Sequence, residues 1–259
     1  MERKGVLLSV AYDGAGFAGW ARQPKGRTVE EILAGAILAV DPAASAPRGT
    51  SRTDAGVHAE AQPVAFDAAL PIEPRGWVLA INANLPDDVA VRSARAVPAE
   101  YAPRFASRGK RYRYRLLLDV VRDPNARART WRVGWTLDLE RMRREGERLV
   151  GRHDFAAFRT SSDERKETTR TLTRVSVERE SERVVAIVVE GDAFLHNMVR
   201  IIAGTLVDVG RGQLEEGAVL RAFESRERAH LGPTAPPEGL TLEHVDLELP
   251  EGTGVPWPR

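Results

Sequence analysis

Hydrophobic and polar positions repeat with two different periods along the chain. A period of two residues is typical of a half-buried strand, whereas spacings of three and four residues are typical of a helix with one apolar face. The first part of the chain is thereby predicted to contain strand 6–12, helix 28–40, helix 75–83 and strand 89–97. The second part is predicted to contain strand 109–118, helix 138–150, a hairpin of strands 172–179 and 183–190, helices 194–209 and 215–225, and strand 240–249.

Short polar signals mark several of these boundaries. Thr28 and Glu31 have the spacing of a capping box at the start of the first helix, and Asp41-Pro42 would end that helix. Asp138 is expected to cap the third helix in the same way.

The order of these elements predicts an α+β fold. It consists of two related α/β halves, each a sheet backed by helices on one side, and no repeated strand-to-helix crossover suggests a doubly wound parallel sheet. Residues 98–103 resemble a connection between the halves. We therefore expect an N-terminal half over 1–103 and a C-terminal half over 104–259.

Composition excludes several classes of protein. The chain has 259 residues, of which 42% are apolar and 29% charged, as in a globular protein that can bury a core. The absence of cysteine excludes disulfide frameworks, thiolate nucleophiles and zinc sites built on cysteine. The five histidines lie too far apart for local metal-ligand pairs, so no metal site is expected. The apolar run before Asp13 is too short for a signal peptide or a membrane span, which favours a cytoplasmic protein without a membrane partner.

Positive charge is concentrated in one segment of a nearly neutral chain. The formal net charge is +1, yet residues 101–132 carry ten basic residues against two acids. Because contacts with phosphates depend on the local field, this segment is a candidate polyanion-binding face. A solvated basic surface is the alternative interpretation, and the preference for arginine over lysine also fits simple codon bias.

A glycine motif in the first quarter resembles a dinucleotide-binding loop. Gly14, Gly16 and Gly19 follow the first predicted strand with the G-x-G-x-x-G spacing. Pro24 and Gly26 then occur where a helix would have to begin to face a pyrophosphate. The context therefore argues against a nicotinamide or flavin cofactor.

Three further features could carry chemistry, although each has a structural alternative. Asp54 lies in a polar loop with Arg52 before it and Gly56 after it, an arrangement also found in turns and caps. Arg200 is the only formal charge between Asp192 and Asp208 in an otherwise apolar predicted helix, so it either reaches solvent or pairs with an acid such as Asp54. Tyr112, which alternates with arginines on a strand, could stack on a base or pack in the core.

Taken together, ordered motifs across nearly the whole chain resemble the TruA family of tRNA pseudouridine synthases. The matching blocks are Tyr12-Asp13-Gly14, Phe17-Ala18-Gly19-Trp20, Arg52-Thr53-Asp54-Ala55-Gly56-Val57-His58, Asn82-Ala83-Asn84-Leu85-Pro86, Lys110-Arg111-Tyr112-Arg113-Tyr114, His153-Asp154-Phe155, Phe194-Leu195-His196-Asn197-Met198-Val199-Arg200 and Ala235-Pro236-Pro237-Glu238-Gly239-Leu240. Ser51 and Ala21 depart from the family pattern, as does the segment 61–64, which puts the detailed shape of the catalytic loop in question.

The resemblance implies an activity, a fold and a set of roles. The activity is isomerisation of uridine to pseudouridine at positions 38, 39 and 40 in the anticodon stem-loop of tRNA, by a homodimer without metal or organic cofactor. The fold is two halves that share an extended antiparallel sheet, with the active cleft between them. Asp54 would be the catalytic carboxylate, Arg52 would hold the flipped nucleotide, Tyr112 would stack on the uracil and Arg200 would pair with Asp54.

Two alternatives from other functional classes stay open at this stage. A catalytically silent RNA-binding relative would keep the basic strand without needing Asp54, Arg52 and Arg200 together. A glycosidase-like hydrolase would need a second carboxylate about 5 to 9 Å from the first.

Overall fold

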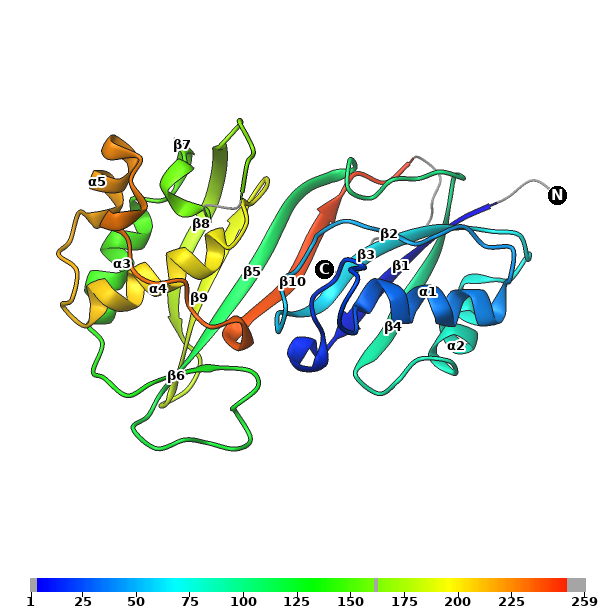
Figure 1. Ribbon diagram of the computed structural model, residues 1–259, viewed down its shortest axis with the longest axis horizontal. Helices are drawn as coiled ribbons and strands as arrows, with labels where there is room; N and C mark the ends of the chain where they lie inside the picture. The colour runs from blue at the N-terminus through cyan, green and yellow to red at the C-terminus, as the bar shows by residue number, and fades with distance from the viewer. Residues whose placement is uncertain (1–3, 161–162, 251–259) are drawn as a thin grey trace. The chain divides into compact units, whose positions relative to one another are not determined.

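The computed structural model describes residues 4–160 and 163–250, which form two compact units (Figure 1). Unit 1 contains the chain up to Arg108 and again from Leu242, and unit 2 contains Gly109–Thr241. The division predicted at 103/104 does not include this return of the chain to unit 1. The return has a physical reason, because Leu247 and Leu249 pack against a buried apolar cluster of unit 1 strands.

Unit 1 is built on strands in the order β4-β1-β3-β10. β1 (Lys4–Tyr12) pairs antiparallel with both β3 (His58–Ala68) and β4 (Val89–Val97). β10 (Leu240–Leu247) lies beside β3, and the short β2 (Arg48–Gly49) also pairs with β3. β1 is buried along almost its whole length, which fits its apolar sequence and central place.

Helices α1 (Val29–Val40) and α2 (Pro74–Asn82) pack on each other, and α2 packs on β4. The core on this side of the sheet includes Trp77 of α2 and Phe66 of β3, whose rings meet edge to face with their centroids 5.1 Å apart. The strands and helices predicted for this part of the chain are confirmed, with ends that differ by one or two residues.

The capping box predicted at the start of α1 is wrong in its side-chain contacts. Thr28 is the N-cap residue, but its hydroxyl is buried and makes no hydrogen bond within the described part of the chain. Glu31 forms an ion pair with Arg22, and Glu30 accepts a hydrogen bond from the Arg22 N–H. The first-turn acids of α1 are therefore used to hold the preceding segment.

Unit 2 is built on strands in the order β5-β9-β8-β7. β5 (Ser107–Leu118) pairs antiparallel with β9 (Val184–Gly191), β9 with β8 (Thr169–Arg179), and β8 with β7 (Gly151–Asp154). The short β6 (Trp131–Val133) pairs parallel with β5. The predicted hairpin of strands 172–179 and 183–190 is confirmed as β8 and β9, and the predicted strand 109–118 is confirmed as β5.

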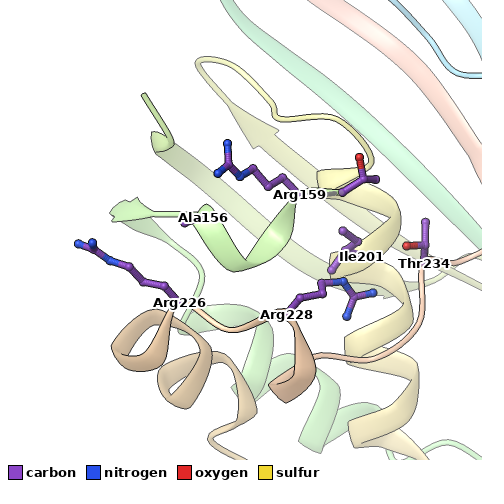
Figure 2. A pocket seen from close by; sticks show the side chains of 7 residues that line it. Ala156, Arg159, Ile201, Arg226, Arg228 and Thr234 are labelled. Carbon is purple, nitrogen blue, oxygen red and sulfur yellow. The ribbon is translucent and has the colours of Figure 1, made fainter. Parts of the chain in front are cut away.

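Three helices accompany these strands: α3 (Leu139–Glu147), α4 (Met198–Gly210) and α5 (Ala218–Ser225). α3 packs on β8 and on α4. Every residue of α4 is buried except Arg200. Four 3-10 turns complete the described elements: η1 (Gly14–Gly16), η2 (Ala156–Phe158), η3 (Arg228–His230) and η4 (Pro237–Gly239). An open pocket of about 440 Å³ lies among η2, α4 and the segment 226–234 (Figure 2).

Helix boundaries in unit 2 differ from the prediction where the backbone turns left-handed. α4 begins at Met198 and not at 194, because Asn197 has φ 61° and cannot continue a helix. α5 begins at Ala218 and not at 215, because Gly217 has φ 88°. Asp138 does cap α3, since its carboxylate accepts the backbone N–H groups of Glu140 and Arg141.

The α+β class with mostly antiparallel strands is confirmed. The extended sheet shared by the halves and the cleft between them stay predictions. In the described ranges, none of the helices combines the length and the apolar character that a membrane span requires.

The closest backbone approach in unit 2 gives a test of the fold. A Cβ atom on Gly204 of α4 would lie 1.8 Å from the Pro233 carbonyl oxygen, whereas a Cβ on Gly35 of α1 would meet nothing within 4 Å. We predict that Gly204→Ala destabilises the protein by about 2 kcal/mol or more, because the 232–235 segment must move away from α4. The matched Gly35→Ala should stabilise it by about 0.5–1 kcal/mol through helix propensity. Urea unfolding followed by circular dichroism measures both, and equal midpoints would contradict the packing described.

Candidate active site

The loop that carries Asp54 connects β2 to β3 in unit 1. Its tip is a tight turn in which the Val57 N–H donates to the Asp54 carbonyl oxygen at 3.1 Å and Gly56 has φ 79°. Asp54 is half-buried, and Arg52 is exposed. The loop therefore carries a half-buried carboxylate and, two residues before it in sequence, a guanidinium that is open to solvent.

Main-chain hydrogen bonds join the segment after β1 to this loop. The Trp20 N–H donates to the Thr53 carbonyl at 3.1 Å, and the Gly56 N–H donates to the Phe17 carbonyl at 3.3 Å. The hydroxyl groups of Tyr12 and Thr53 lie 2.7 Å apart and are buried. These bonds fix the residues on both sides of Asp54.

Two glycines of the G-x-G-x-x-G spacing allow this close packing. A Cβ on Gly14 would lie 2.1 Å from the Val57 carbonyl oxygen, and one on Gly19 would lie 2.9 Å from the Thr53 carbonyl oxygen. Gly19 also has φ 111°, which side chains rarely permit. A Cβ on Gly16 would meet only ordinary contacts, the nearest at 3.5 Å. The glycines therefore serve the approach of one backbone segment to another.

The departure at Ser51 leaves the loop well supported. The Ser51 N–H donates to Oε1 of Gln62, and the Gln62 side-chain amide donates back to the Ser51 carbonyl. Both residues are buried, and Ser51 is not among the described residues with a left-handed backbone. A side chain at this position therefore causes no backbone strain.

An ion pair stabilises the entrance to the 14–20 segment. Arg27 donates to both carboxylate oxygens of Asp88 at 2.5 and 2.8 Å, and its guanidinium lies 4.1 Å from the ring centre of Phe17. The Asp88 carbonyl accepts the Asp13 N–H at 2.9 Å. The hydrogen bond with Arg27 lowers the pKa of Asp88, so the pair stays charged near neutral pH.

The two tyrosines of β5 have different environments in unit 2. Tyr114 is fully buried, its hydroxyl donates to the Pro236 carbonyl at 2.7 Å, and burial strongly raises its pKa. Tyr112 is 8% exposed, and its ring meets that of Phe194 edge to face at 5.0 Å. Tyr114 is therefore a core residue, whereas Tyr112 lies at the border of the core.

Arg200 is held near the start of α4 by two neutral acceptors. Its Nε donates to the Ala235 carbonyl at 2.8 Å, and one terminal nitrogen donates to Oδ1 of Asn197 at 2.7 Å. The Arg200 carbonyl accepts the Ala235 N–H at 3.1 Å, so the two segments are joined in both directions. The left-handed backbone of Asn197 ends the preceding turn and turns its amide toward Arg200, which gives the guanidinium a fixed orientation.

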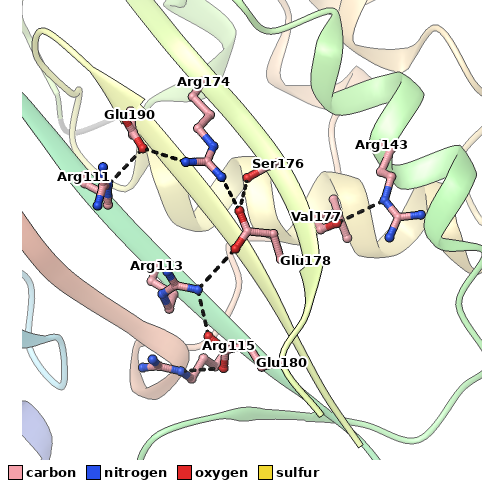
Figure 3. Close-up of polar contacts among 10 residues, drawn as sticks. All are labelled: Arg111, Arg113, Arg115, Arg143, Arg174, Ser176, Val177, Glu178, Glu180 and Glu190. Atoms are coloured by element: carbon pink, nitrogen blue, oxygen red, sulfur yellow. Dashed lines mark hydrogen bonds and ion pairs between the residues drawn. The ribbon is translucent and has the colours of Figure 1, made fainter. Parts of the chain in front are cut away.

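The arginines on the other face of β5 pair with carboxylates and do not form an open cationic surface (Figure 3). Arg111 pairs with Glu190, and both Arg113 and Arg115 pair with Glu180. Further pairs join Arg113 and Arg174 to Glu178, and Arg174 to Glu190. Counting charge along the sequence missed these partners because they come from β8, from β9 and from the turn between these strands. The predicted polyanion-binding face therefore does not extend over Arg111, Arg113 and Arg115.

The predicted site residues are thus distributed between the two units. Asp54 and Arg52 belong to the loop of unit 1, and Tyr112 and Arg200 belong to unit 2. The pairing of Arg200 with Asp54 stays a prediction. Within the ranges that the structure describes, His, Cys, Asp and Glu side chains form no group of three that could hold a metal ion.

The motif blocks contain Asn197 and Ala235, but sequence analysis did not predict the contacts by which these residues and Gln62 position the candidate groups. Gln62, Asn197 and Ala235 act through hydrogen bonds with partners 3 to 35 positions away. Asn197 had a usable signal, since asparagine tolerates the left-handed conformation and often precedes a helix. Ala235 acts only through its backbone, and nothing in its side chain could have indicated that role.

Comparison with known proteins identifies the class. A family model described as tRNA pseudouridine synthase matches residues 8–106 and 147–248. A relative from Myxococcus xanthus named tRNA pseudouridine synthase A is 42% identical over 240 residues, covering 93% of this chain and 91% of the relative. A second, from Citrifermentans bemidjiense and with the same name, is 41% identical and covers 93% and 97%.

One solved chain, from a Cbf5-Nop10-Gar1 complex, matches with a TM-score of 0.33 and 13% identity, covering 81% of this chain and 55% of that one. That likeness is too low to support an inference.

An isomerase that acts on tRNA is therefore the class that motifs and relatives define. The chain belongs to the tRNA pseudouridine synthase family, in the TruA group of relatives named tRNA pseudouridine synthase A.

The close packing beneath Asp54 leads to a prediction about activity. We expect Gly19→Ala to lower kcat by about tenfold or more with little change in tRNA affinity, because the added methyl displaces the backbone on both sides of Asp54. Gly16→Ala, in the same motif but without close contacts, is the matched control and should behave like the wild type. Single-turnover pseudouridine formation and tRNA binding measure the two effects, and equal activity of the two variants would rule out this role for Gly19.

Proposed function

We propose that this protein converts uridine to pseudouridine at positions 38, 39 and 40 in the anticodon stem-loop of tRNA, with Asp54 as the catalytic carboxylate. The observation that carries the proposal is the fixed, half-buried position of Asp54 on a loop bonded on both sides to the 12–20 segment. The resemblance of the sequence motifs to the TruA family supports the choice of tRNA positions 38, 39 and 40. We further propose, on the same resemblance, a cytoplasmic homodimer.

The reaction needs one ionised carboxylate and no net change in composition. The bond between C1′ and N1 breaks, the uracil rotates, C5 joins C1′, and the C5 proton is lost while N1 gains one. Asp54 would act on the sugar as a nucleophile or as a base, and both routes require its charged form. An arginine beside it would favour that form in a desolvated site.

The other proposed roles follow from the chemistry of each side chain. Arg52, exposed next to Asp54, would hold the backbone of the flipped nucleotide. Tyr112 would place its ring against the uracil, which offsets part of the free energy of unstacking. Arg200, oriented by Asn197 and Ala235, would pair with Asp54 and keep it ionised.

Mapping of pseudouridine on an unmodified tRNA transcript tests the proposed positions. We expect new pseudouridine at one or more of positions 38, 39 and 40 where the transcript has uridine, and none in a transcript with cytidine at all three. Modification confined to another arm of the tRNA would overturn the proposed positions while leaving the family assignment in place.

The role of Asp54 is tested by Asp54→Asn with Asp87→Asn as a control. Both substitutions remove one negative charge from unit 1, and Asp87 is an exposed loop residue outside the contacts described. We predict that Asp54→Asn retains less than about 1% of wild-type turnover with tRNA affinity within a few fold, because the carboxylate contributes mainly in the transition state. Asp87→Asn should match the wild type. Turnover by purified Asp54→Asn above that level would refute the assignment, and turnover by the wild type in the same assay excludes the silent-relative alternative.

The role of Tyr112 is tested against Tyr114, its neighbour on the same strand face. Tyr112→Phe should keep substantial activity, whereas Tyr112→Ala should lose about 1–3 kcal/mol of stacking in the reaction. Tyr114→Ala should instead lose about 3–5 kcal/mol of folding stability, since Tyr114 is a fully buried aromatic residue. Melting and activity are measured on all three variants. If Tyr112→Ala unfolds as early as Tyr114→Ala and its folded fraction turns over normally, Tyr112 is only a packing residue.

A further inference from the structure

The open pocket of unit 2 is lined by residues to which neither motif nor relative assigns a role. Seven residues line it: Ala156, Arg159, Thr160, Ile201, Arg226, Arg228 and Thr234. Its volume of about 440 Å³ would accept a nucleotide. Three of the seven are arginines, two are threonines and none is acidic, so the lining favours an anion.

Arg228 is the side chain that faces the pocket. In Figure 2 its guanidinium lies beside Ile201 and Thr234, whereas Arg159 and Arg226 extend away from that point. Arg228 is half-buried, and one terminal nitrogen donates to the Leu231 carbonyl at 3.1 Å. It forms no ion pair with any described carboxylate, and burial lowers its pKa without an acid to offset the effect. A half-buried cation of this kind gains most from an external anion.

The other arginines bordering this region are already engaged. Arg226 pairs with Asp154 at 3.0 Å, and Arg159 donates to the carbonyl groups of Asp163 and Arg165. On β5 the arginines pair with glutamates (Figure 3). Arg228 is therefore the guanidinium of this pocket with donors still available to a ligand.

The pocket adjoins the residues that hold Arg200. Ile201 directly follows Arg200 on α4, and Thr234 directly precedes Ala235, whose carbonyl accepts from Arg200. A group bound on Arg228 would therefore lie within a few residues of the proposed substrate-binding arginine, as a neighbouring nucleotide of the same RNA strand would.

We propose that this pocket is a phosphate subsite, in which Arg228 binds a backbone phosphate of the tRNA with Thr234 as a hydroxyl partner. The proposal rests on the proposed function for its ligand and adds a binding residue outside the set already described. Guanidinium groups suit phosphate because they offer two parallel N–H donors, and each phosphate neutralised contributes a defined share of the salt dependence.

The test compares tRNA binding by wild type, Arg228→Gln, Arg228→Lys and Arg221→Gln over a range of salt concentrations. Arg221 is an exposed arginine of α5 outside the pocket and is the matched control. Arg228→Gln should weaken binding by roughly tenfold at low salt and make the log–log salt slope shallower by about 0.7 to 0.9. Arg228→Lys should keep the slope but lose part of the affinity, because the charge stays and the fork is lost. Arg221→Gln should change neither value.

Equal slopes and affinities for Arg228→Gln and Arg221→Gln would overturn the proposal. Should Arg228→Gln melt early, Thr234→Val keeps the arginine and should still weaken tRNA binding by roughly threefold through the lost hydroxyl. No change in Thr234→Val would then count against the subsite.

A second arm separates backbone phosphate from free phosphate. Inorganic phosphate should displace tRNA from wild type more strongly than chloride of equal ionic strength, and this excess should vanish in Arg228→Gln. Displacement by phosphate without any change in the salt slope would mean that the pocket takes a free anion and would overturn the tRNA assignment. Because the assay reads binding alone, failure of pseudouridine formation at positions 38–40 would refute the proposed function and leave this result intact.

Discussion

The loop that carries Asp54 depends on two places where main chain packs directly on main chain. At Gly14 and Gly19 the polypeptide after β1 comes so close to residues 53–57 that no side chain fits between them. Hydrogen bonds from Trp20 and Gly56 cross this contact in both directions. In the proposed role of Asp54 such a rigid support would matter, because small displacements of a catalytic group reduce the rate steeply.

In unit 2 the corresponding feature is a cation, Arg200, that is held in one orientation on the apolar helix α4. Arg200 is the one residue of α4 that is not buried, and acceptors from Asn197 and Ala235 help to set its direction. The arginines of β5, by contrast, form ion pairs with Glu190 and Glu180. The positive charge of this strand therefore serves largely to form ion pairs within the sheet. The guanidinium groups with functional potential come from helices and loops.

The sequence predicts most of the fold, because hydrophobic periodicity reports which faces are buried. Every predicted strand and helix exists, but β2, β3, β6 and β7 were not predicted, and two helices begin later than predicted because Asn197 or Gly217 adopts a left-handed backbone that periodicity does not register. The return of the chain from Leu242 to unit 1 is a long-range packing effect on Leu7 and its neighbours, which no local pattern encodes.

The candidate site can be approached from the sequence in part. Motifs point to Asp54, Arg52, Tyr112 and Arg200, because a motif records residue type and order, and the roles of these residues stay proposals. Their supports were missed, since Ala235 acts through its carbonyl and Gln62 through an amide eleven residues from its partner. The contribution of Gly14 and Gly19 of the glycine motif to backbone packing becomes visible only in three dimensions.

The central claim is that the Asp54 loop is already formed in the absence of RNA, and amide hydrogen exchange measures this directly. In the free protein, the Trp20 and Val57 N–H groups, which donate to Thr53 and Asp54, should exchange at least about a thousandfold more slowly than in an unstructured peptide. Their protection should approach that of β1. Exchange within about tenfold of the unstructured rate, with β1 still protected, would show that the loop forms only on binding tRNA and would contradict the account.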